Sequence, residues 1–129
     1  MPCLIAAPAS GSGKTLVSLA LTALARRRGR TIQTFKVGPD YLDPQLLSAA
    51  SGRPCRNLDP LLCGEAWVRQ SFQRHGGAAE LALVEGVMGL FDGAGLPSVS
   101  NCGFGSLRGN RGWPVAVRGD APRPKDGNQ

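Results

Sequence analysis

Residues 8–15, Pro-Ala-Ser-Gly-Ser-Gly-Lys-Thr, constrain the fold more than any other part of the sequence. They follow a short apolar run at 3–7 and precede a helix-forming run at 16–28. A strand, a glycine-rich turn that ends in Gly-Lys-Thr, and a helix together form the context of a phosphate-binding loop. Small residues let successive backbone N–H groups turn toward a phosphate, and the helix N-terminus adds further unpaired N–H groups. A flexible turn ahead of a helix is the simpler alternative, but it does not account for the flanking strand.

The later part of this loop is expected to hold the phosphates of a nucleotide. Pro8 stands where the usual pattern has its first glycine, and it lacks an N–H group. We expect Lys14 to reach the terminal phosphates and the Thr15 hydroxyl to bind Mg²⁺. The predicted nucleotide-binding residues are Gly11, Ser12, Gly13, Lys14 and Thr15.

The rest of the chain alternates between strand-like and helix-like segments. Strands are predicted at 3–7, 31–37 and 81–84, with a further candidate at 113–117; helices are predicted at 16–28, 44–50 and 65–75. Residues 52–60, punctuated by glycine and proline, are predicted to form a loop. The strand–helix–strand order predicts right-handed parallel crossovers. The expected fold class is α/β, a P-loop NTPase-like parallel sheet flanked by helices, with the sheet incomplete.

The net charge of +6 is the main compositional hint of a polyanionic partner. The densest basic cluster, at 26–30, falls at the end of the first predicted helix, where cations oppose the negative end of the helix dipole. We favour this local explanation over a nucleic-acid-binding patch, and we expect no nucleic-acid partner.

Cysteine usage and hydropathy bear on the setting of the protein. The four cysteines form no Cys-x-x-Cys motif, and the sequence has a single histidine, so a zinc site is not expected. Scattered cysteines beside a nucleotide-binding loop favour a reducing, cytoplasmic location. The sequence shows no signal-peptide pattern at its start and no apolar run long enough to span a bilayer, so we expect no membrane partner.

Acidic residues follow two predicted strands. Asp40 ends a Gly-Pro-Asp turn, and Glu85 comes directly after the apolar run 81–84. Ligands of doubly wound sheets lie at the carboxyl ends of strands, where P-loop enzymes place an Mg²⁺-binding carboxylate. We therefore predict Asp40 and Glu85 as metal ligands together with Thr15. A turn or capping role is the alternative for both acids, and on local sequence it is the stronger one for Asp40.

Three other charged residues can be interpreted from the local sequence. Lys36 lies near the end of a buried strand, so its amine either reaches the surface or faces the phosphate site and neutralises a reacting anion. Asp43, ahead of Pro44, is expected to cap the helix 44–50. Asp92 is a loop acid on local evidence.

Four separated segments, taken together, resemble one known family. They are 7–15, then 35–44 (Phe-Lys-Val-Gly-Pro-Asp-Tyr-Leu-Asp-Pro), then 52–59 with Arg-Asn-Leu-Asp, then 84–93 (Val-Glu-Gly-Val-Met-Gly-Leu-Phe-Asp-Gly). In this order and spacing they resemble the N-terminal part of the cobyrinic acid a,c-diamide synthases, within the wider dethiobiotin synthetase-like superfamily. The resemblance covers about the first 95 residues.

This resemblance implies an ATP-dependent ligase of cobalamin biosynthesis. Such enzymes convert the a and c acetate side chains of cobyrinic or hydrogenobyrinic acid to amides through an acyl phosphate, with ammonia taken from glutamine. By resemblance, Thr15, Asp40 and Glu85 match metal and phosphate positions. The implied catalytic residues are Lys14, Lys36, Asp43 and Asp92, and the implied cofactors are ATP and Mg²⁺.

Proteins of the family that this sequence resembles contain parts that the sequence does not show. We expect 1–95 to be the ATP-binding synthetase domain and 96–129 to be an atypical Gly/Pro/Arg-rich tail from a truncated or frame-shifted copy. A glutamine amidotransferase domain is expected to be absent. The alternatives are an inactive fragment of such an enzyme and a P-loop switch ATPase, although Ala9 and Ser10 stand where partitioning ATPases carry an extra lysine. A homodimer is left open.

Overall fold

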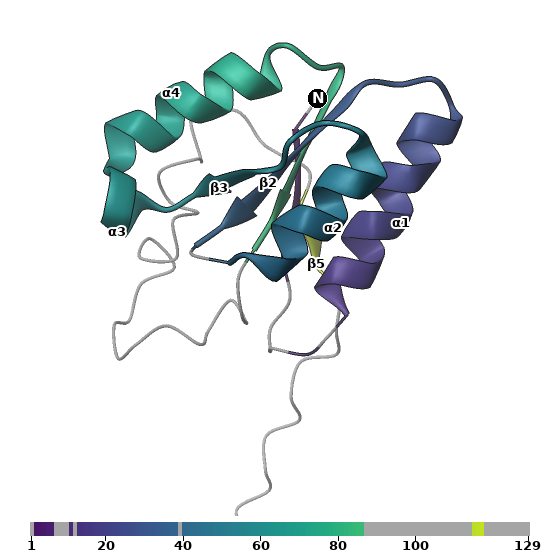
Figure 1. Cartoon of the computed structure of the whole chain (residues 1–129), viewed down its shortest axis with the longest axis horizontal. Helices are drawn as coiled ribbons and strands as arrows, with labels where there is room; N and C mark the ends of the chain where they lie inside the picture. Colours follow the sequence, from purple (N-terminus) through teal and green to yellow (C-terminus); the bar gives the residue numbers. More distant parts are fainter. Residues whose placement is uncertain (1, 7–10, 12, 39, 87–114, 118–129) are drawn as a thin grey trace, which may run out of the picture.

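Five parallel strands form a single sheet in the computed structural model, which describes residues 2–6, 11, 13–38, 40–86 and 115–117 (Figure 1). The strands are β1 (Pro2–Ala6), β2 (Ile32–Val37), β3 (Arg56–Leu58), β4 (Leu81–Glu85) and β5 (Val115–Val117). Their spatial order is β3-β2-β4-β1-β5, so β4 lies between the first two strands of the chain. All four strand pairings are parallel, as the sequence predicted.

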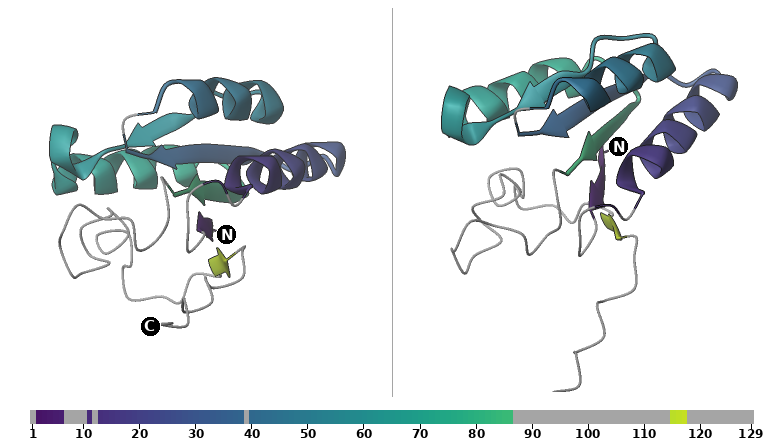
Figure 2. Two further views of the ribbon diagram at one scale, coloured as in Figure 1. Left: turned by 90° about the horizontal axis from the view of Figure 1, so that it is seen from below. Right: turned by 60° about the horizontal axis from the view of Figure 1, so that its bottom comes forward.

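Helices cover both faces of this sheet (Figure 2). The helix α1 (Lys14–Arg27) packs beside α2 (Leu42–Ser51) on one face, while the short α3 (Pro60–Cys63) and α4 (Glu65–Gly76) belong to the other. Chain direction explains this division. Right-handed crossovers that move toward the β3 edge use one face, and the return from β3 to β4 uses the opposite face. The result is the α/β architecture of a partial P-loop NTPase-like domain.

The strand β2 is buried along its whole length because both of its faces are covered. Phe35 and Val37 point into the core beneath α4, where Phe35 packs against Val68 and its ring centroid lies 5.0 Å from that of Phe72. Ile32 points to the other face, where it joins Ala25 of α1 in a second core cluster. Alternate residues of one strand therefore stabilise two separate helix layers.

Most of the predicted elements are confirmed, with shifts of one or two residues at their ends. Two predictions are wrong. Residues 56–58 of the predicted loop form the edge strand β3, which pairs with β2 from Phe35 to Val37. The second helix begins at Leu42, so Asp43 lies inside its first turn and is not its N-cap. The short helix α3 was also missed.

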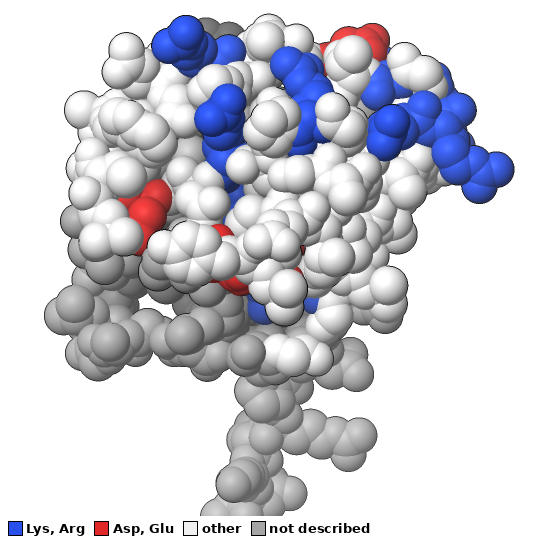
Figure 3. All heavy atoms as spheres, viewed as in Figure 1, with Lys and Arg blue, Asp and Glu red and all other residues white. Residues whose placement is uncertain are grey.

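The amino edge of the sheet carries the basic residues of the end of α1. Figure 3 shows Lys and Arg gathered over this end of the helix, near the upper right of the view. Arg26 donates hydrogen bonds to the carbonyl oxygens of Ala49 and Ala50, at 3.4 and 3.1 Å. Arg26 thus supplies hydrogen-bond donors to carbonyl oxygens at the C-terminal end of α2. This is a structural role, in line with an explanation of the basic cluster that needs no nucleic acid.

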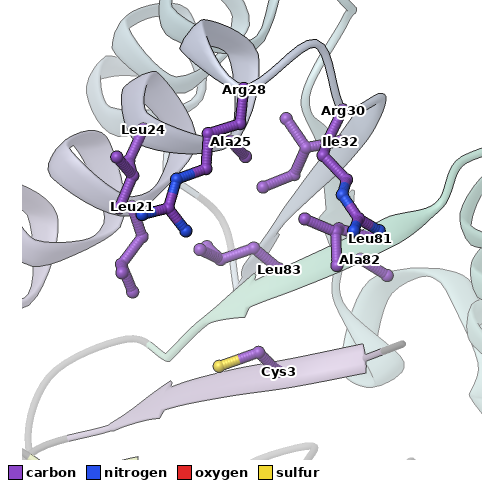
Figure 4. A pocket seen from close by; sticks show the side chains of 10 residues that line it. All are labelled: Cys3, Leu21, Leu24, Ala25, Arg28, Arg30, Ile32, Leu81, Ala82 and Leu83. Carbon is purple, nitrogen blue, oxygen red and sulfur yellow. The ribbon is translucent and has the colours of Figure 1, made fainter.

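A cavity of about 520 Å³ opens at the same edge, between α1 and the starts of β1, β2 and β4 (Figure 4). Its walls are mostly apolar, with Leu24, Ile32 and Leu83 among them, and Arg28 and Arg30 border it. This cavity lies at the end of the sheet opposite to the carboxyl ends of the strands, so it is separate from the predicted phosphate site. Within the described ranges, no helix has the length and apolar character needed to cross a membrane.

Candidate functional site

Four side chains from four different elements meet at the carboxyl edge of the sheet. Thr15 comes from the first turn of α1 and Asp43 from the first turn of α2, while Lys36 and Glu85 come from the ends of β2 and β4. These residues are brought together because parallel strands end at one edge and the following helices start there. The sequence predicted functional roles for all four, and the structure brings them into contact.

Lys36 lies at the centre of this cluster. Its Nζ atom is 2.9 Å from Asp43 Oδ2 and 3.0 Å from Glu85 Oε1, and it also donates to the Gly86 carbonyl oxygen at 3.3 Å. Its side chain is only 4% exposed, so the amine does not reach the surface. Of the two interpretations of Lys36, the geometry favours an ammonium held inside the site by two carboxylates.

These ion pairs shift the pKa values of both partners. Burial alone would lower the pKa of Lys36, but the hydrogen bond to Asp43 and the charge of Glu85 outweigh it and raise that pKa. Burial would raise the pKa of Asp43, but the hydrogen bond and charge of Lys36, with the Thr15 hydroxyl, lower it. Both groups are therefore held in their charged forms.

Thr15 and Glu85 are in direct contact. The Thr15 hydroxyl oxygen lies 2.7 Å from Glu85 Oε1 and 3.1 Å from Asp43 Oδ2. A hydroxyl group has one hydrogen, so it donates to only one of these carboxylates at a time. Glu85 is fully buried, and its second oxygen, Oε2, has no hydrogen-bond partner among the residues that the structure describes. A buried carboxylate oxygen without a donor is costly, which is the expected mark of a ligand-binding group.

Asp40 has a different position from its predicted partners. Its Oδ1 atom accepts hydrogen bonds from the backbone N–H groups of Leu42 and Asp43, at 3.0 and 3.3 Å, and so caps α2. Its Oδ2 atom lies 3.6 Å from Lys36 Nζ. Asp43, rather than Asp40, lies next to the Thr15 hydroxyl.

Asn57 is a residue of this region to which the sequence reasoning gave no role. Its side-chain amide donates to the carbonyl oxygens of Gly38 and Asp40, at 3.0 and 2.8 Å. It was overlooked because residues 52–60 were interpreted as a loop. The only available signal was the Arg-Asn-Leu-Asp segment that contributed to the family resemblance.

The described part of the phosphate-binding loop has the backbone that such a loop requires. Gly11 and Gly13 have φ angles of 75° and 80°, values that residues with a side chain rarely adopt. Lys14 opens α1 and is buried. The predicted residues Ser12 and Asp92, and also Pro8, lie outside the described residues.

The oxygen atoms around Thr15 are of the chemical type that a magnesium ion binds. A hydroxyl and two carboxylates are hard oxygen ligands, and Glu85 Oε2 is free to accept a further interaction within the described part of the chain. No three His, Cys, Asp or Glu side chains in that part are grouped closely enough to hold a metal by themselves. A magnesium ion at this site would therefore also need the Thr15 hydroxyl and oxygen atoms from a bound nucleotide as ligands.

A comparison with protein families gives one match to this chain. The CobQ/CobB/MinD/ParA nucleotide-binding domain matches residues 3–89, which include all the contacting side chains described above.

Individual curated proteins show a narrower similarity. The cobyrinate a,c-diamide synthase of Syntrophotalea carbinolica is 61% identical over 90 residues, which cover 70% of this chain and 20% of that protein. The hydrogenobyrinate a,c-diamide synthase of Pseudomonas aeruginosa is 57% identical over 90 residues, covering 70% of this chain and 21% of the relative. This chain therefore spans about one fifth of the length of the curated relatives that it matches.

Proposed function

This chain belongs to the CobQ/CobB/MinD/ParA nucleotide-binding domain family, and we propose that it is the ATP-binding part of a cobyrinate or hydrogenobyrinate a,c-diamide synthase. The observation that carries the proposal is the buried contact of Lys36 and Thr15 with Glu85 at the end of the phosphate-binding loop. The names of the relatives support the corrinoid substrate, and the site geometry supports the use of a nucleotide.

The proposed reaction is the conversion of a carboxylate to an amide. A carboxylate is a poor acylating agent, so ATP first phosphorylates it, which creates an acyl phosphate and releases ADP. Ammonia, derived from glutamine, then attacks the acyl carbon, and inorganic phosphate leaves. Each of the two acetate side chains, a and c, would consume one ATP in this way.

The residues of the phosphate-binding loop would bind and orient the nucleotide. Backbone N–H groups from Gly11 to Thr15 would surround the phosphates, and the start of α1 would add its partial positive charge. Lys14 would neutralise charge on the phosphoryl group that is transferred. Lys36 is the second cation of the site, and its raised pKa supports a permanent positive charge there.

Magnesium is the metal that these ligands favour. Thr15 and Glu85 would hold it, and the contact of Asp43 with the Thr15 hydroxyl supports Asp43 as a nearer carboxylate than Asp40. When bound, such an ion neutralises charge on phosphate oxygens. Asp40 would then act mainly through its cap on α2, while Asp92 stays a predicted catalytic residue.

The proposed location is the cytoplasm. Cys3, Cys55 and Cys63, the cysteines in the described part of the chain, are all free thiols, which agrees with a reducing compartment. Amide synthesis from ATP also requires the nucleotide pool of that compartment.

An amidation assay tests the proposal. The purified chain would be incubated with ATP, Mg²⁺, ammonium and cobyrinic acid, and amides would be detected by mass spectrometry, with Lys14→Ala as the inactive control. Formation of amides that depends on ATP supports the synthetase function. Binding of ATP without product would support a nucleotide-binding module instead, and absence of ATP binding would overturn both.

A further inference from the structure

We propose that Asn57 is a positioning residue that sets the acidic turn at 38–43 for magnesium-dependent nucleotide binding, an inference that rests on the proposed function. Asn57 lies in the edge strand β3, and none of the residues predicted to bind nucleotide or metal comes from that strand. Its amide donates to backbone carbonyl oxygens. It acts through the backbone of the turn that connects β2 to α2.

The first step is the contact between Asn57 and the turn. Its Nδ2 atom carries two hydrogens and lies 3.0 Å from the Gly38 carbonyl oxygen and 2.8 Å from that of Asp40. Gly38 itself has a φ of 83°, and its N–H donates to the Leu58 carbonyl oxygen at 3.0 Å. Strand β3 therefore holds the turn at Gly38 and at Asp40. Gly38 is a glycine whose own backbone allows many conformations.

The second step leads from the turn to the carboxylates. The side chain of Asp40 accepts the N–H groups of Leu42 and Asp43, so the position of Asp40 sets the first turn of α2. Asp43 in that turn contacts both Lys36 and Thr15. A displacement of the Asp40 backbone would therefore move the Asp43 carboxylate, which lies 3.1 Å from the Thr15 hydroxyl.

An amide is the side chain that this position requires. The Gly38 carbonyl oxygen also accepts the Asp40 N–H at 3.1 Å, so the amide adds a second donor to it and one donor to the Asp40 carbonyl oxygen. Asparagine offers these two hydrogens, and an ionised aspartate of the same size does not. Asp40, Asp43 and Glu85 all pair with Lys36 on the neighbouring strand, and a donor without positive charge leaves that pairing undisturbed. Asn57 is the register partner of Lys36 in the parallel pairing of β2 and β3.

The chain contains a matched control at the other end of β2. Gln33 is 3% exposed, and its side-chain amide likewise donates to two backbone carbonyl oxygens, those of Thr34 and Pro54, at 3.0 and 2.8 Å. Gln33→Ala removes the same chemical contacts away from the site. Asn57 is half-buried and Gln33 is buried, so a purely structural effect of losing a hydrogen-bonded amide should be at least as large in Gln33→Ala as in Asn57→Ala.

The first measurement is hydrogen–deuterium exchange of the full chain without nucleotide. Asn57→Ala and Asn57→Asp should both increase exchange at residues 40–43, whereas Gln33→Ala should leave exchange there unchanged. Asn57→Asp keeps the size of the side chain, so it separates loss of donors from loss of volume. Unchanged exchange at 40–43 in both Asn57 variants would overturn the proposal, whatever the chain binds.

The second measurement is the affinity for a fluorescent ATP analogue with Mg²⁺ and with EDTA. Both Asn57 variants should lose about tenfold of the gain in affinity that Mg²⁺ provides, as is typical for residues that orient metal ligands. Their affinity in EDTA should stay that of the wild type, and Gln33→Ala should keep the full gain. An undiminished gain in the Asn57 variants would overturn the inference. Failure of the wild-type chain to bind would instead count against the proposed function, while the exchange experiment would still decide the positioning.

Discussion

Lys36 and Glu85 are direct partners in the parallel pairing of β2 with β4, and their side chains meet at 3.0 Å between Nζ and Oε1. Both side chains are nearly inaccessible to water, with exposed fractions of 4% and 0%. The pairing of two strands thus places an ammonium and a carboxylate side by side where a third strand, β1, leads into the phosphate-binding loop. The edge that carries the candidate site is therefore tied to the register of the sheet.

Removal of one partner of this pair should destabilise the fold strongly. Lys36→Met leaves the Glu85 carboxyl group buried without its cationic partner, and we expect a loss of about 3–5 kcal/mol in the free energy of unfolding. The double variant Lys36→Met/Glu85→Gln should cost less than the sum of the two single variants, by about 1–3 kcal/mol. Urea unfolding followed by circular dichroism measures all three differences.

The exposed pair Arg69–Glu65 provides the control for this cycle. Its atoms approach to 2.9 Å, as close as those of the buried pair, but both side chains are more than half exposed. The same cycle with Arg69→Met and Glu65→Gln should give a coupling below about 1 kcal/mol. Equal coupling in the two cycles would contradict a special role for burial at Lys36.

The stability of the chain should fall at both ends of the pH scale. Lys36 has a pKa raised above its ordinary value of 10.5, so its contribution is complete below that value and is lost as the pH rises through the raised pKa. Asp43 has a pKa lowered below 3.8, so its contribution is present above that value and is lost as the pH falls through the lowered pKa.

Thermal unfolding between about pH 3 and 11 measures this dependence. The difference in Tm between the wild type and Lys36→Met isolates the contribution of the cluster from those of other titrating groups. That difference should be constant near neutral pH and shrink above about pH 10.5. A difference that stays constant into the alkaline range would show that the charge of Lys36 does not stabilise the fold.

Lys14→Ala should abolish measurable nucleotide binding while leaving the fold intact. Lys14 opens α1, and the cation expected on the terminal phosphates would be lost. Isothermal titration with ATP and Mg²⁺ gives the affinity, and circular dichroism checks the fold. Arg27→Ala, an exposed cation at the other end of the same helix, should keep the wild-type affinity. Unchanged affinity in Lys14→Ala would refute the phosphate assignment of the loop.

Phe35→Ala should be among the most destabilising apolar substitutions. Phe35 is fully buried and packs with Val68 and Phe72 beneath α4, so its truncation should cost about 3–5 kcal/mol. Trp67, on the same helix as Val68, is 47% exposed, and Trp67→Ala should cost clearly less. Denaturant midpoints compare the two, and a larger loss for Trp67 would mean that α4 packs with its other face.

Cys63 should react with iodoacetamide faster than Cys55 at about pH 8. Burial raises the pKa of the Cys55 thiol to about 11, and the residue is only partly exposed, whereas Cys63 is exposed. Because the thiolate is the reactive form, Cys55 should stay largely unmodified until the chain unfolds. Peptide mapping by mass spectrometry follows each site, and comparable rates in the native chain would contradict the packing around β3.

Much of the fold could be predicted because its signals are local. The apolar runs, the glycine-rich turn and the end of α4 at Gly76 are all properties of short segments. The strand β3 could not be predicted because its three residues, Arg-Asn-Leu, carry no β pattern of their own. Its place is determined by the neighbouring strand β2, and not by intrinsic propensity.

The residues of the candidate site could be predicted from the sequence, but the contacts between them could not. Thr15 and Glu85 are 70 residues apart, and only the order of the strands brings them to 2.7 Å. The different contacts of Asp40 and Asp43 have the same origin. Both acids follow β2, and which of them reaches Thr15 depends on α2 starting at Leu42, two residues earlier than its proline suggested.

The hydrogen bonds from Arg26 to Ala49 and Ala50 have a mechanical consequence. They join the far end of α2 to α1, while the near ends of the two helices carry Asp43 and Thr15 into the site. The two helices are therefore joined by hydrogen bonds at both ends. A displacement at the start of α1 would therefore reach Asp43 both through its direct contact with Thr15 and through the far ends of the two helices, which Arg26 joins.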